Sequence, residues 1–241
     1  MPFITIYLLC YNEEILLPHA LKHYKERFPN ASFVIIDNES TDNSVEIAKS
    51  FGCEIYTWKT NNIANIVENV KLKDNIWKTA TTDWVLIADM DEWLEITEEQ
   101  LNQEDARGIT ILRNHGVQIV AESQSLLLDD IDLHTLRDGF FDNGYDKTIC
   151  FKRTLITDIN FTRGAHKSNP KGKVVFQKVP YIMKHMNFLG LPWYTEKMKV
   201  RFLRTEFNRI KLRCSGHYSN SDSVILSKFN NVLSITKKNL F

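Results

Sequence analysis

Short apolar runs alternate with helical patterns through the first hundred residues. The runs FITIYLL, SFVIID, CEIYTW and DWVLIA are rich in β-branched and aromatic residues, and they predict strands. Between them, EEILLPHALKHYKERF, DNSVEIAKSFG and IANIVENVKLKDNIWKTA have apolar residues at helical spacing. This alternation predicts an α/β fold, with a doubly wound, mostly parallel, Rossmann-like sheet and helices on both faces.

The ends of these helices have recognisable signals. Pro18 falls early enough to be tolerated near the first turn of its helix. Asn43 and Glu46 have the spacing of a capping box, and Gly52 suits a helix stop.

The pattern changes after Leu94. GITILRN, VQIVAES, KTICFKR, GKVVFQKV and YIMKHM read as strands, whereas residues 123–146 are acidic and irregular and predict a long functional loop. Residues 192–214 predict a basic helix that packs through an apolar stripe at Val200, Leu203, Phe207 and Ile210.

No repeat or linker divides the chain. We therefore expect one domain over 1–241, with a nucleotide-binding half (1–95), an acceptor-binding half (96–190) and a helical C-terminal extension (191–241).

Composition narrows the functional classes. The 241 residues are 43% hydrophobic, enough for one sizeable core, and 30 basic side chains balance 30 acidic ones. No overall field therefore favours nucleic acid or a membrane. The N-terminus lacks the features of a signal peptide, and no run approaches a membrane span, so we expect a cytoplasmic protein. The four cysteines are scattered, without a CxxC pair, and are interpreted as reduced thiols, mostly in the core.

One segment departs from this balance, because residues 197–213 have seven basic side chains and one acidic side chain. A solvated helix face is the favoured interpretation. Peripheral contact with an anionic membrane, where lipid-linked acceptors occur, is the alternative.

Polar clusters follow three of the predicted parallel strands. They are Tyr11, Asn12 and Glu13; Asp37, Asn38 and Glu39; and Asp89, Asp91 and Glu92. Ligands of open α/β sheets bind beyond the carboxyl ends of the strands, so these clusters should converge. Side chains two apart on an extended segment share a side, which aims Asp89 and Asp91 together. Two such carboxylates suit Mn²⁺ or Mg²⁺.

The spacing is not unique, because Asp130 and Asp132 form a second Asp-x-Asp pair. That pair lies outside the alternating region, in a Leu-rich stretch that forms strands poorly, and we interpret it as loop or helix-end charge. Asp89 and Asp91 have a structural alternative too, a solvated turn that caps a helix. Their expected convergence with Asp37 and the Asn12 loop favours the metal site.

Four stretches carry a family resemblance: YLLCYNEEILLPHAL, VIIDNESTDNSVEIAKSFG, KDNIWKTATTDWVLIADMDEWL and GAHKSNPKGK. In this order and at these separations they resemble a family-2-type glycosyltransferase of the GT-A fold. The resemblance is strong over about 3–95, moderate over 145–190 and absent from the C-terminal fifth. It implies transfer of a hexosyl group from a nucleoside diphosphate sugar, with UDP favoured, to a sugar, lipid-linked or protein-linked acceptor, in glycan or polysaccharide synthesis.

The resemblance also implies roles for single residues. Tyr11, Asn12 and Glu13 would form the nucleotide loop, and Asp37 would bind the base or ribose unless it only forms a turn. Lys73, Asp74 and Asn75 match polar positions before the metal motif, although an exposed ion pair on a helix would also explain Lys73 and Asp74. Asp89 and Asp91 would hold the metal, with Asp89 also near the donor.

Two further groups complete the predicted chemistry. An acceptor hydroxyl needs a base, usually a carboxylate in inverting transfer; Asp146 is the first candidate, with Glu92 and Asp142 as alternatives. Related enzymes often take a third metal ligand from the C-terminal half, and this implies His185, with His166 contacting donor or acceptor. A structural histidine is the alternative at both positions.

Two other functions stay open at this point. A nucleotidyltransferase also places carboxylates and a metal at sheet ends, but a Gly-rich phosphate loop is expected there, and CYNEE contains no glycine. A non-catalytic module that binds nucleotide sugars is the other alternative, and turnover would exclude it.

Overall fold

The main sheet has the predicted parallel arrangement. The computed structural model describes residues 3–241; Met1 and Pro2 lie outside the described residues. The sheet has five strands in the order β3-β2-β1-β4-β8, of which the first four are parallel and β8 is antiparallel. Their bounds are β1 (Ile4–Cys10), β2 (Ser32–Asp37), β3 (Glu54–Thr57), β4 (Trp84–Asp89) and β8 (Cys150–Lys152). The predicted mixed α/β fold with a mostly parallel sheet is confirmed.

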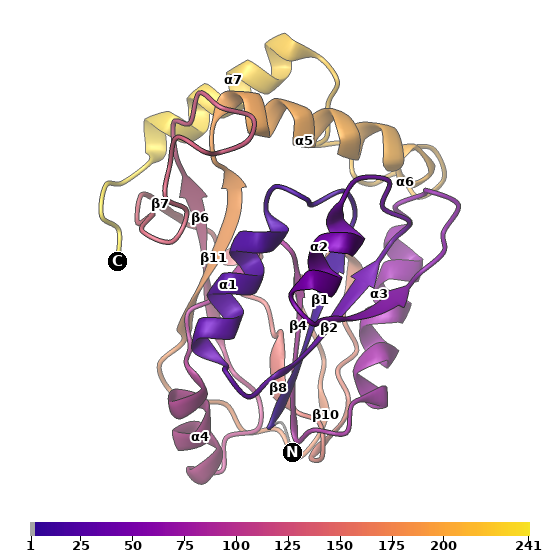
Figure 1. Cartoon of the computed structure of the whole chain (residues 1–241), viewed down its shortest axis with the longest axis vertical. Coiled ribbons are helices and arrows are strands. Elements are labelled where there is room, and N and C mark those ends of the chain that lie inside the picture. The colour runs from indigo at the N-terminus through magenta and orange to yellow at the C-terminus, as the bar shows by residue number, and fades with distance from the viewer. Residues whose placement is uncertain (1–2) are drawn as a thin grey trace.

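Helices cover both faces of this sheet (Figure 1). On one face, Ile6 and Leu8 of β1 pack with the core side chains of α1 (Leu17–Arg27) and α2 (Ser44–Ser50). On the other face, Tyr7 packs with Trp77 of η1 (Ile76–Thr79), which follows α3 (Ile66–Asn75). Successive strand side chains point to opposite faces, so a strand buried on both sides needs a continuous apolar run. That requirement explains the runs in the sequence.

A second sheet adjoins the first, with the order β5-β11-β6-β7. Its strands are β5 (Glu92–Leu94), β6 (Asn114–Val120), β7 (Gly139–Phe141) and β11 (Tyr181–Phe188). β5 begins just after β4 ends, and it pairs antiparallel with β11, placing His185 opposite Glu92. The second sheet therefore brings β11 to the carboxyl end of β4.

The middle of the chain has fewer strands than predicted. In GITILRN only Ile111 forms an isolated bridge, and the strand β6 begins at Asn114. GKVVFQKV contributes the two-residue β10 (Lys171–Gly172), paired with β9 (Ile156–Asp158), and one bridge at Phe176. An additional helix, α4 (Glu98–Ala106), begins with a capping box between Thr97 and Gln100.

The segment 123–146 is mostly loop and includes β7 and the short η2 (Asn143–Tyr145). Asp130 organises its first half, because its carboxylate accepts hydrogen bonds from the Ser123 hydroxyl and from the Gln124 backbone N–H, the latter at 2.8 Å. This fits the interpretation of the second Asp-x-Asp pair as loop charge.

The C-terminal helices differ from the prediction in division and orientation. The helix expected over 192–214 is split at Thr205 into α5 (Leu191–Arg204) and α6 (Glu206–Lys211), and α7 (Asp222–Ile235) packs on α5. Most of the expected packing stripe is exposed instead: Leu203 is 70% exposed and Ile210 is 64% exposed, whereas Val200 is partly buried and lines the cavity described below. The side of α5 that faces the carboxyl ends of the main sheet carries Lys197, Arg201 and Arg204, and Leu203 faces outward.

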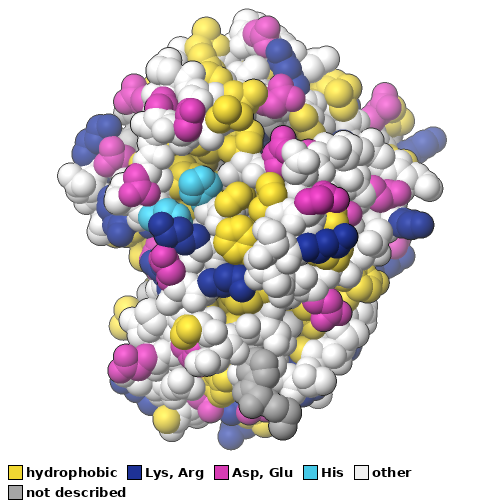
Figure 2. All heavy atoms as spheres, viewed as in Figure 1, with side chains coloured by type: hydrophobic (Ala, Val, Ile, Leu, Met, Phe, Trp, Pro, Cys, Tyr) yellow, Lys and Arg dark blue, Asp and Glu magenta, His cyan; other side chains and the backbone are white. Residues whose placement is uncertain are grey.

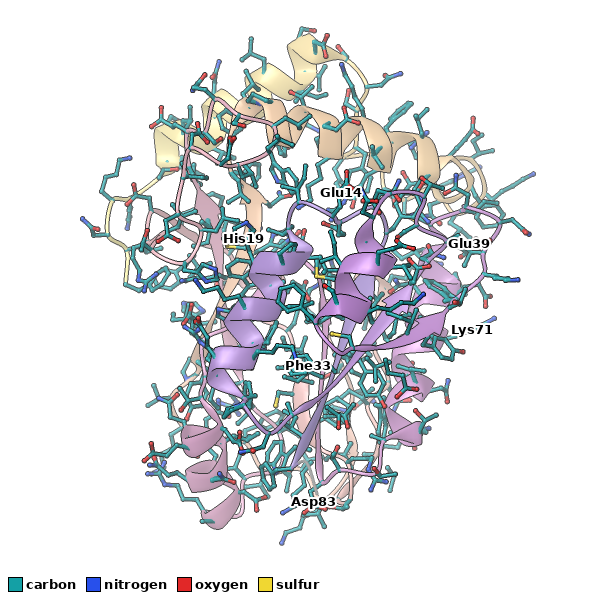
Figure 3. The ribbon with its side chains drawn as sticks, in the orientation of Figure 1. Glu14, His19, Phe33, Glu39, Lys71 and Asp83 are labelled. Atoms are coloured by element: carbon teal, nitrogen blue, oxygen red, sulfur yellow. The ribbon has the colours of Figure 1, made fainter. Side chains whose placement is uncertain are left out.

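The predicted helix signals hold in part. Pro18 lies at the start of α1, and Gly52 follows α2 with a φ of 74°. Asn43 makes no side-chain cap; its backbone N–H and amide donate to Glu14 instead, at 3.1 and 2.8 Å. Glu14 and Glu39 lie at the carboxyl end of the sheet, and Asp83, which precedes β4, lies at the opposite end (Figure 3).

The surface shown in Figure 2 has acidic and basic side chains interspersed, in keeping with a net charge of zero. Within residues 3–241, no helix has both the length and the apolar character needed to cross a membrane. Cys10, Cys53 and Cys150 are buried free thiols, and Cys214 is a partly exposed one.

Candidate active site

A cavity of about 540 Å³ lies at the carboxyl ends of β1, β2 and β4, where the strand order reverses. The strand register aligns these ends, because Cys10 pairs with Asp37 and Leu9 pairs with Asp89. α5 crosses above them (Figure 1). The cavity lining includes most of the residues selected from the sequence: Tyr11, Asn12, Glu13, Lys73, Asp89, Asp91, Glu92, His166 and His185.

Other selected residues lie outside this lining, among them Asp37, Asn75 and Asp146, and each of these three makes a local structural contact. Asp37 is buried and accepts a hydrogen bond from the Ser40 backbone N–H at 3.2 Å, as in the turn alternative, whereas Asn38 beside it lines the cavity. The Asn75 amide donates to the Lys71 carbonyl at 2.8 Å. Asp146 accepts from the Gly116 backbone N–H at 2.8 Å. Their roles toward substrate stay predictions.

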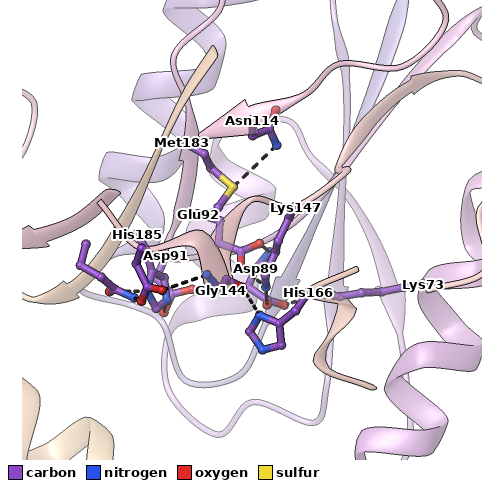
Figure 4. A network of polar contacts seen from close by, with 12 residues as sticks. Lys73, Asp89, Asp91, Glu92, Asn114, Gly144, Lys147, His166, Met183 and His185 are labelled. Carbon is purple, nitrogen blue, oxygen red and sulfur yellow. Dashed lines mark hydrogen bonds and ion pairs between the residues drawn. The ribbon is translucent and has the colours of Figure 1, made fainter. Parts of the chain in front are cut away.

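Asp89 is held by two lysines (Figure 4). The Lys73 Nζ donates to its Oδ1 at 2.8 Å, and the Lys147 Nζ lies 3.7 Å from its Oδ2. Both lysine side chains are only 3% exposed, so Lys73 does not form the exposed ion pair that was its structural alternative. Burial raises the pKa of Asp89, but the two ammonium groups outweigh burial and lower this pKa to about 2.

Glu92 shapes the turn between β4 and β5. Its side chain is buried, forms an ion pair with Lys147 and accepts a hydrogen bond from the Asp89 backbone N–H at 3.2 Å. Lys147 therefore joins Glu92 to Asp89, and the two carboxylates balance its buried charge. This pairing fixes the backbone from which Asp89 and Asp91 project.

Asp91 contacts a different set of groups. Its Oδ2 accepts from the Lys197 Nζ at 2.6 Å and from the Arg201 Nη2 at 3.1 Å, and lies 3.3 Å from the His185 Nε2. Burial would raise the pKa of Asp91, but Lys197, His185 and Arg201 hold it well below its ordinary value. The extended backbone of β4 ends at Asp89, so Asp89 and Asp91 do not point in the same direction. Both line the cavity, but they contact different partners.

The hydrogen bonds of His185 orient its ring toward Asp91. The Gln118 amide donates to Asp142 at 2.9 Å, which directs the Gln118 carbonyl oxygen to the His185 Nδ1 at 2.7 Å. The Nδ1–H therefore donates to Gln118, and in the neutral ring the Nε2 lone pair faces the Asp91 carboxylate. Burial lowers the pKa of His185, against the opposing effect of Asp91, and so favours this neutral form.

This arrangement tests whether a divalent cation fits. Two acceptors, the His185 Nε2 and the Asp91 Oδ2, face each other at 3.3 Å, and a cation between them would satisfy both. Residues 3–241 contain no cluster of three or more His, Cys, Asp or Glu side chains suited to a metal ion. Mg²⁺-type sites commonly use one or two carboxylates and complete their shell with phosphate and water. Asp91 and His185 therefore fit a divalent cation, provided that Lys197 and Arg201 yield their place on Asp91.

His166 lies on the other side of the cavity. Its Nδ1 donates to the Gly144 carbonyl at 2.7 Å, and Tyr145 packs edge-on against its ring while stacking on His185. Gly164 permits this position, because a Cβ on Gly164 would lie 2.6 Å from the His166 Cδ2. Close packing against the His166 ring therefore requires a glycine at position 164.

The loop after β1 supplies the rest of the near wall. Asn12 has a φ of 51°, and its side-chain oxygen accepts from the Thr41 backbone N–H at 2.7 Å. Glu13 is half-buried, and burial and the nearby Asp91 raise its pKa to about 8. Tyr11 presents its ring to the cavity, where the Arg204 guanidinium lies 3.3 Å from the ring centroid.

Sequence reasoning missed four basic residues of this site: Lys147, Lys197, Arg201 and Arg204. A signal was present for three of them, because positions 197, 201 and 204 have the spacing of one helix face. The apolar stripe on the same predicted helix indicated the opposite face as the packed one, so these basic residues were not predicted to face the site. For Lys147 no local pattern exists, since its partners come from distant segments.

Comparison with known proteins finds a family similarity in the N-terminal part of the chain. Residues 5–103 match the model of the family described as "Glycosyl transferase family 2". This part of the chain is similar to that family. The segment that matches family 2 includes β1 to β4, Asp89, Asp91 and Glu92, and therefore the strand ends that build the cavity.

The individual proteins that this chain resembles are distant from it. Protein RfbJ of Shigella flexneri is 27% identical over 67 residues, which are 28% of this chain and 52% of RfbJ. A structure of S. aureus TarS 1–349 has a TM-score of 0.47 and 15% identity, over 96% of this chain and 72% of that one. Mannosyltransferase PcManGT from Pyrobaculum calidifontis, in complex with GDP-Man and Mn²⁺, has a TM-score of 0.45 and 12% identity, over 97% of this chain and 74% of that one. The match spans about half the length of RfbJ, and the chain covers 43% of a longer TarS structure.

Proposed function

We propose that this protein transfers a hexosyl group from a nucleoside diphosphate sugar, with UDP favoured, to an acceptor hydroxyl in glycan or polysaccharide synthesis. The observation that carries the proposal is the cavity at the strand-order reversal of a family 2 segment, where Asp91 and His185 converge beside five basic side chains: Lys73, Lys147, Lys197, Arg201 and Arg204. A cavity of this size and charge suits a nucleotide sugar. The absence of a Gly-rich loop in CYNEE and the family match both weigh against a nucleotidyltransferase.

We propose that Asp91 and His185 would hold Mn²⁺ or Mg²⁺ together with Asp89, which is the ligand set predicted from the sequence. When bound, the cation supplies Lewis-acid neutralisation of the charge that develops on the leaving diphosphate. Lys73 and Lys147 keep Asp89 ionised and oriented. Gln118 keeps the His185 Nε2 directed at Asp91.

The acceptor base is proposed among the carboxylates of the site, as inverting transfer requires. Asp146 and Glu92 were selected from the sequence; Asp146 is engaged by Gly116, and Glu92 by Lys147. Asp142 accepts a hydrogen bond from Gln118 and so helps to orient His185. Glu13 adds a candidate, because it lines the cavity with a pKa raised by burial to about 8. Activity of Glu13→Gln, Glu92→Gln and Asp146→Asn, measured on folded protein, distinguishes these three.

We also propose peripheral membrane contact through the outer side of α5 and α6. Leu203 near the end of α5 and Ile210 in α6 are exposed there, with Lys211 next to Ile210. Apolar side chains gather at the end of the molecule where α5 and α7 lie (Figure 2). Arg201 and Arg204 face the cavity, so the contact would depend on apolar insertion more than on charge.

The test of the main proposal is a panel of nucleotide sugars with and without Mn²⁺, scored by thermal shift and by slow donor hydrolysis. We expect stabilisation by one nucleotide class, greater with Mn²⁺, and release of free sugar. Binding without hydrolysis or transfer would favour a non-catalytic module. No binding of any nucleotide sugar would refute the proposal.

A further inference from the structure

α5 turns a row of basic side chains into the cavity. Lys197, Arg201 and Arg204 are four and three residues apart, so they share one helix face. All three line the cavity, whereas Lys199 on the same helix points away and its Nζ lies 2.6 Å from Asp222 of α7. The Lys197 side chain is only 9% exposed.

The row follows the length of the cavity. At one end, Arg204 stacks on Tyr11 and its Nη2 donates to the Asn38 Oδ1 at 2.5 Å. At the other end, Lys197 and Arg201 contact Asp91. Residues 197 and 204 are about 10 Å apart along a helix at 1.5 Å per residue. That length is comparable to the extent of a nucleoside joined to a diphosphate, with the aromatic ring at the nucleoside end.

The end of the cavity near Asp91 has more positive than negative side chains. Lys147 is balanced by Glu92, and Lys73 by Asp89. Lys197 and Arg201 share a single oxygen of Asp91, which is one negative charge for two positive ones, with Glu13 half-buried nearby. Arg and Lys are the usual ligands of phosphate oxygens. This end of the cavity therefore has cationic donors available to a bound anion.

We propose that Lys197 and Arg201 bind the diphosphate of the donor, and that Asp91 holds them in position when no donor is present. This rests on the proposed function and adds two substrate-contacting residues to it. The two side chains exchange the Asp91 oxygen for phosphate oxygens as the donor enters, which also frees Asp91 and His185 to share a cation. The helix α5 is then part of the donor site, although it lies outside the family 2 segment at residues 5–103.

The test is calorimetric titration of UDP and of uridine, with and without Mn²⁺, into wild type, Lys197→Gln and Arg201→Gln. Lys199→Gln is the matched control, because it removes the same charge from the same helix outside the cavity. Lys197→Arg keeps the charge and serves as the conservative variant. Thermal melts confirm that each variant is folded.

We expect Lys197→Gln and Arg201→Gln each to weaken UDP binding tenfold or more while uridine binding is unchanged, and Lys199→Gln and Lys197→Arg to bind UDP within a few-fold of wild type. Wild-type affinity for UDP in both Gln variants would overturn this inference and leave the proposed function standing. An equal loss for UDP and uridine would also overturn it, since the residues would then only maintain the cavity. A wild type that binds no nucleotide would refute the proposed function itself.

Discussion

Replacing Asp91 by Asn removes the negative charge on which three side chains converge. Lys197, Arg201 and His185 all meet its Oδ2, and the Asp91 side chain is 3% exposed. Asn keeps the size and one acceptor oxygen but leaves two buried or half-buried cations without their counter-charge. The substitution therefore tests both the stability of the network and its chemistry.

The magnitude follows from burial. Removing one partner of a buried ion pair costs about 3–5 kcal/mol. The Lys197 side chain is 9% exposed, but Arg201 is 33% exposed, so solvent screens part of its interaction. With one acceptor retained, we expect a loss of about 3 kcal/mol. For a chain of this size that corresponds to a Tm lower by about 6–12 °C.

The pH dependence has a definite sign. The pKa of Asp91 is lowered by its cationic partners from an ordinary value of 3.8, so its stabilising contribution is fully present above that value. The contribution is lost as the pH falls toward the lower pKa of the folded state. The difference in stability between wild type and Asp91→Asn should therefore be constant from pH 7 to about 5 and narrow below about 4.

The assay is a thermal or urea melt in EDTA, followed by Mn²⁺-dependent donor hydrolysis. Asp130→Asn is the control, because it removes the same charge from an exposed loop. We expect folded Asp130→Asn to hydrolyse donor like wild type, and Asp91→Asn to lose a hundredfold or more in turnover. An Asp91→Asn variant with wild-type stability and hydrolysis, or a loss only in Asp130→Asn, would refute the assignment of the site.

Other outcomes can be checked independently. Burial lowers the pKa of His23 to about 3, so folding stability should fall as the pH drops from about 6.5, by up to about 1.4 kcal/mol per unit, and His23→Gln should flatten that slope in urea titrations. Asp37→Ala should weaken UDP binding by roughly 1–3 kcal/mol in calorimetry; an unchanged affinity in folded protein would assign Asp37 to its turn alone. Asp146→Asn should reduce transfer to acceptor with UDP affinity unchanged, and wild-type transfer rates would exclude it as the base. Leu203→Ser with Ile210→Ser should reduce sedimentation with anionic vesicles; no vesicle binding by wild type would exclude the membrane contact.

Local patterns were sufficient for the N-terminal sheet and for one wall of the site. A parallel strand covered on both faces has to be apolar throughout, so β1, β2 and β4 are visible as runs, and the polar residues after them mark one sheet edge. Asp89 and Asp91 could be selected for that reason alone. The directions in which these two side chains point could not be predicted, because the two-residue turn before β5 sends them to different partners.

Contacts between distant segments decided the remainder. His185 reaches Asp91 because β11 pairs with β5, and Lys147 reaches Glu92 and Asp89 from the loop before β8. The side of α5 that faces inward was misread from its apolar stripe. Burying Leu203 would have stabilised α5, but pairing Lys197 and Arg201 with a buried carboxylate requires the opposite face of the helix to point inward. Hydrophobic periodicity determines which elements form, whereas the partners available to a charge are known only once the chain has folded.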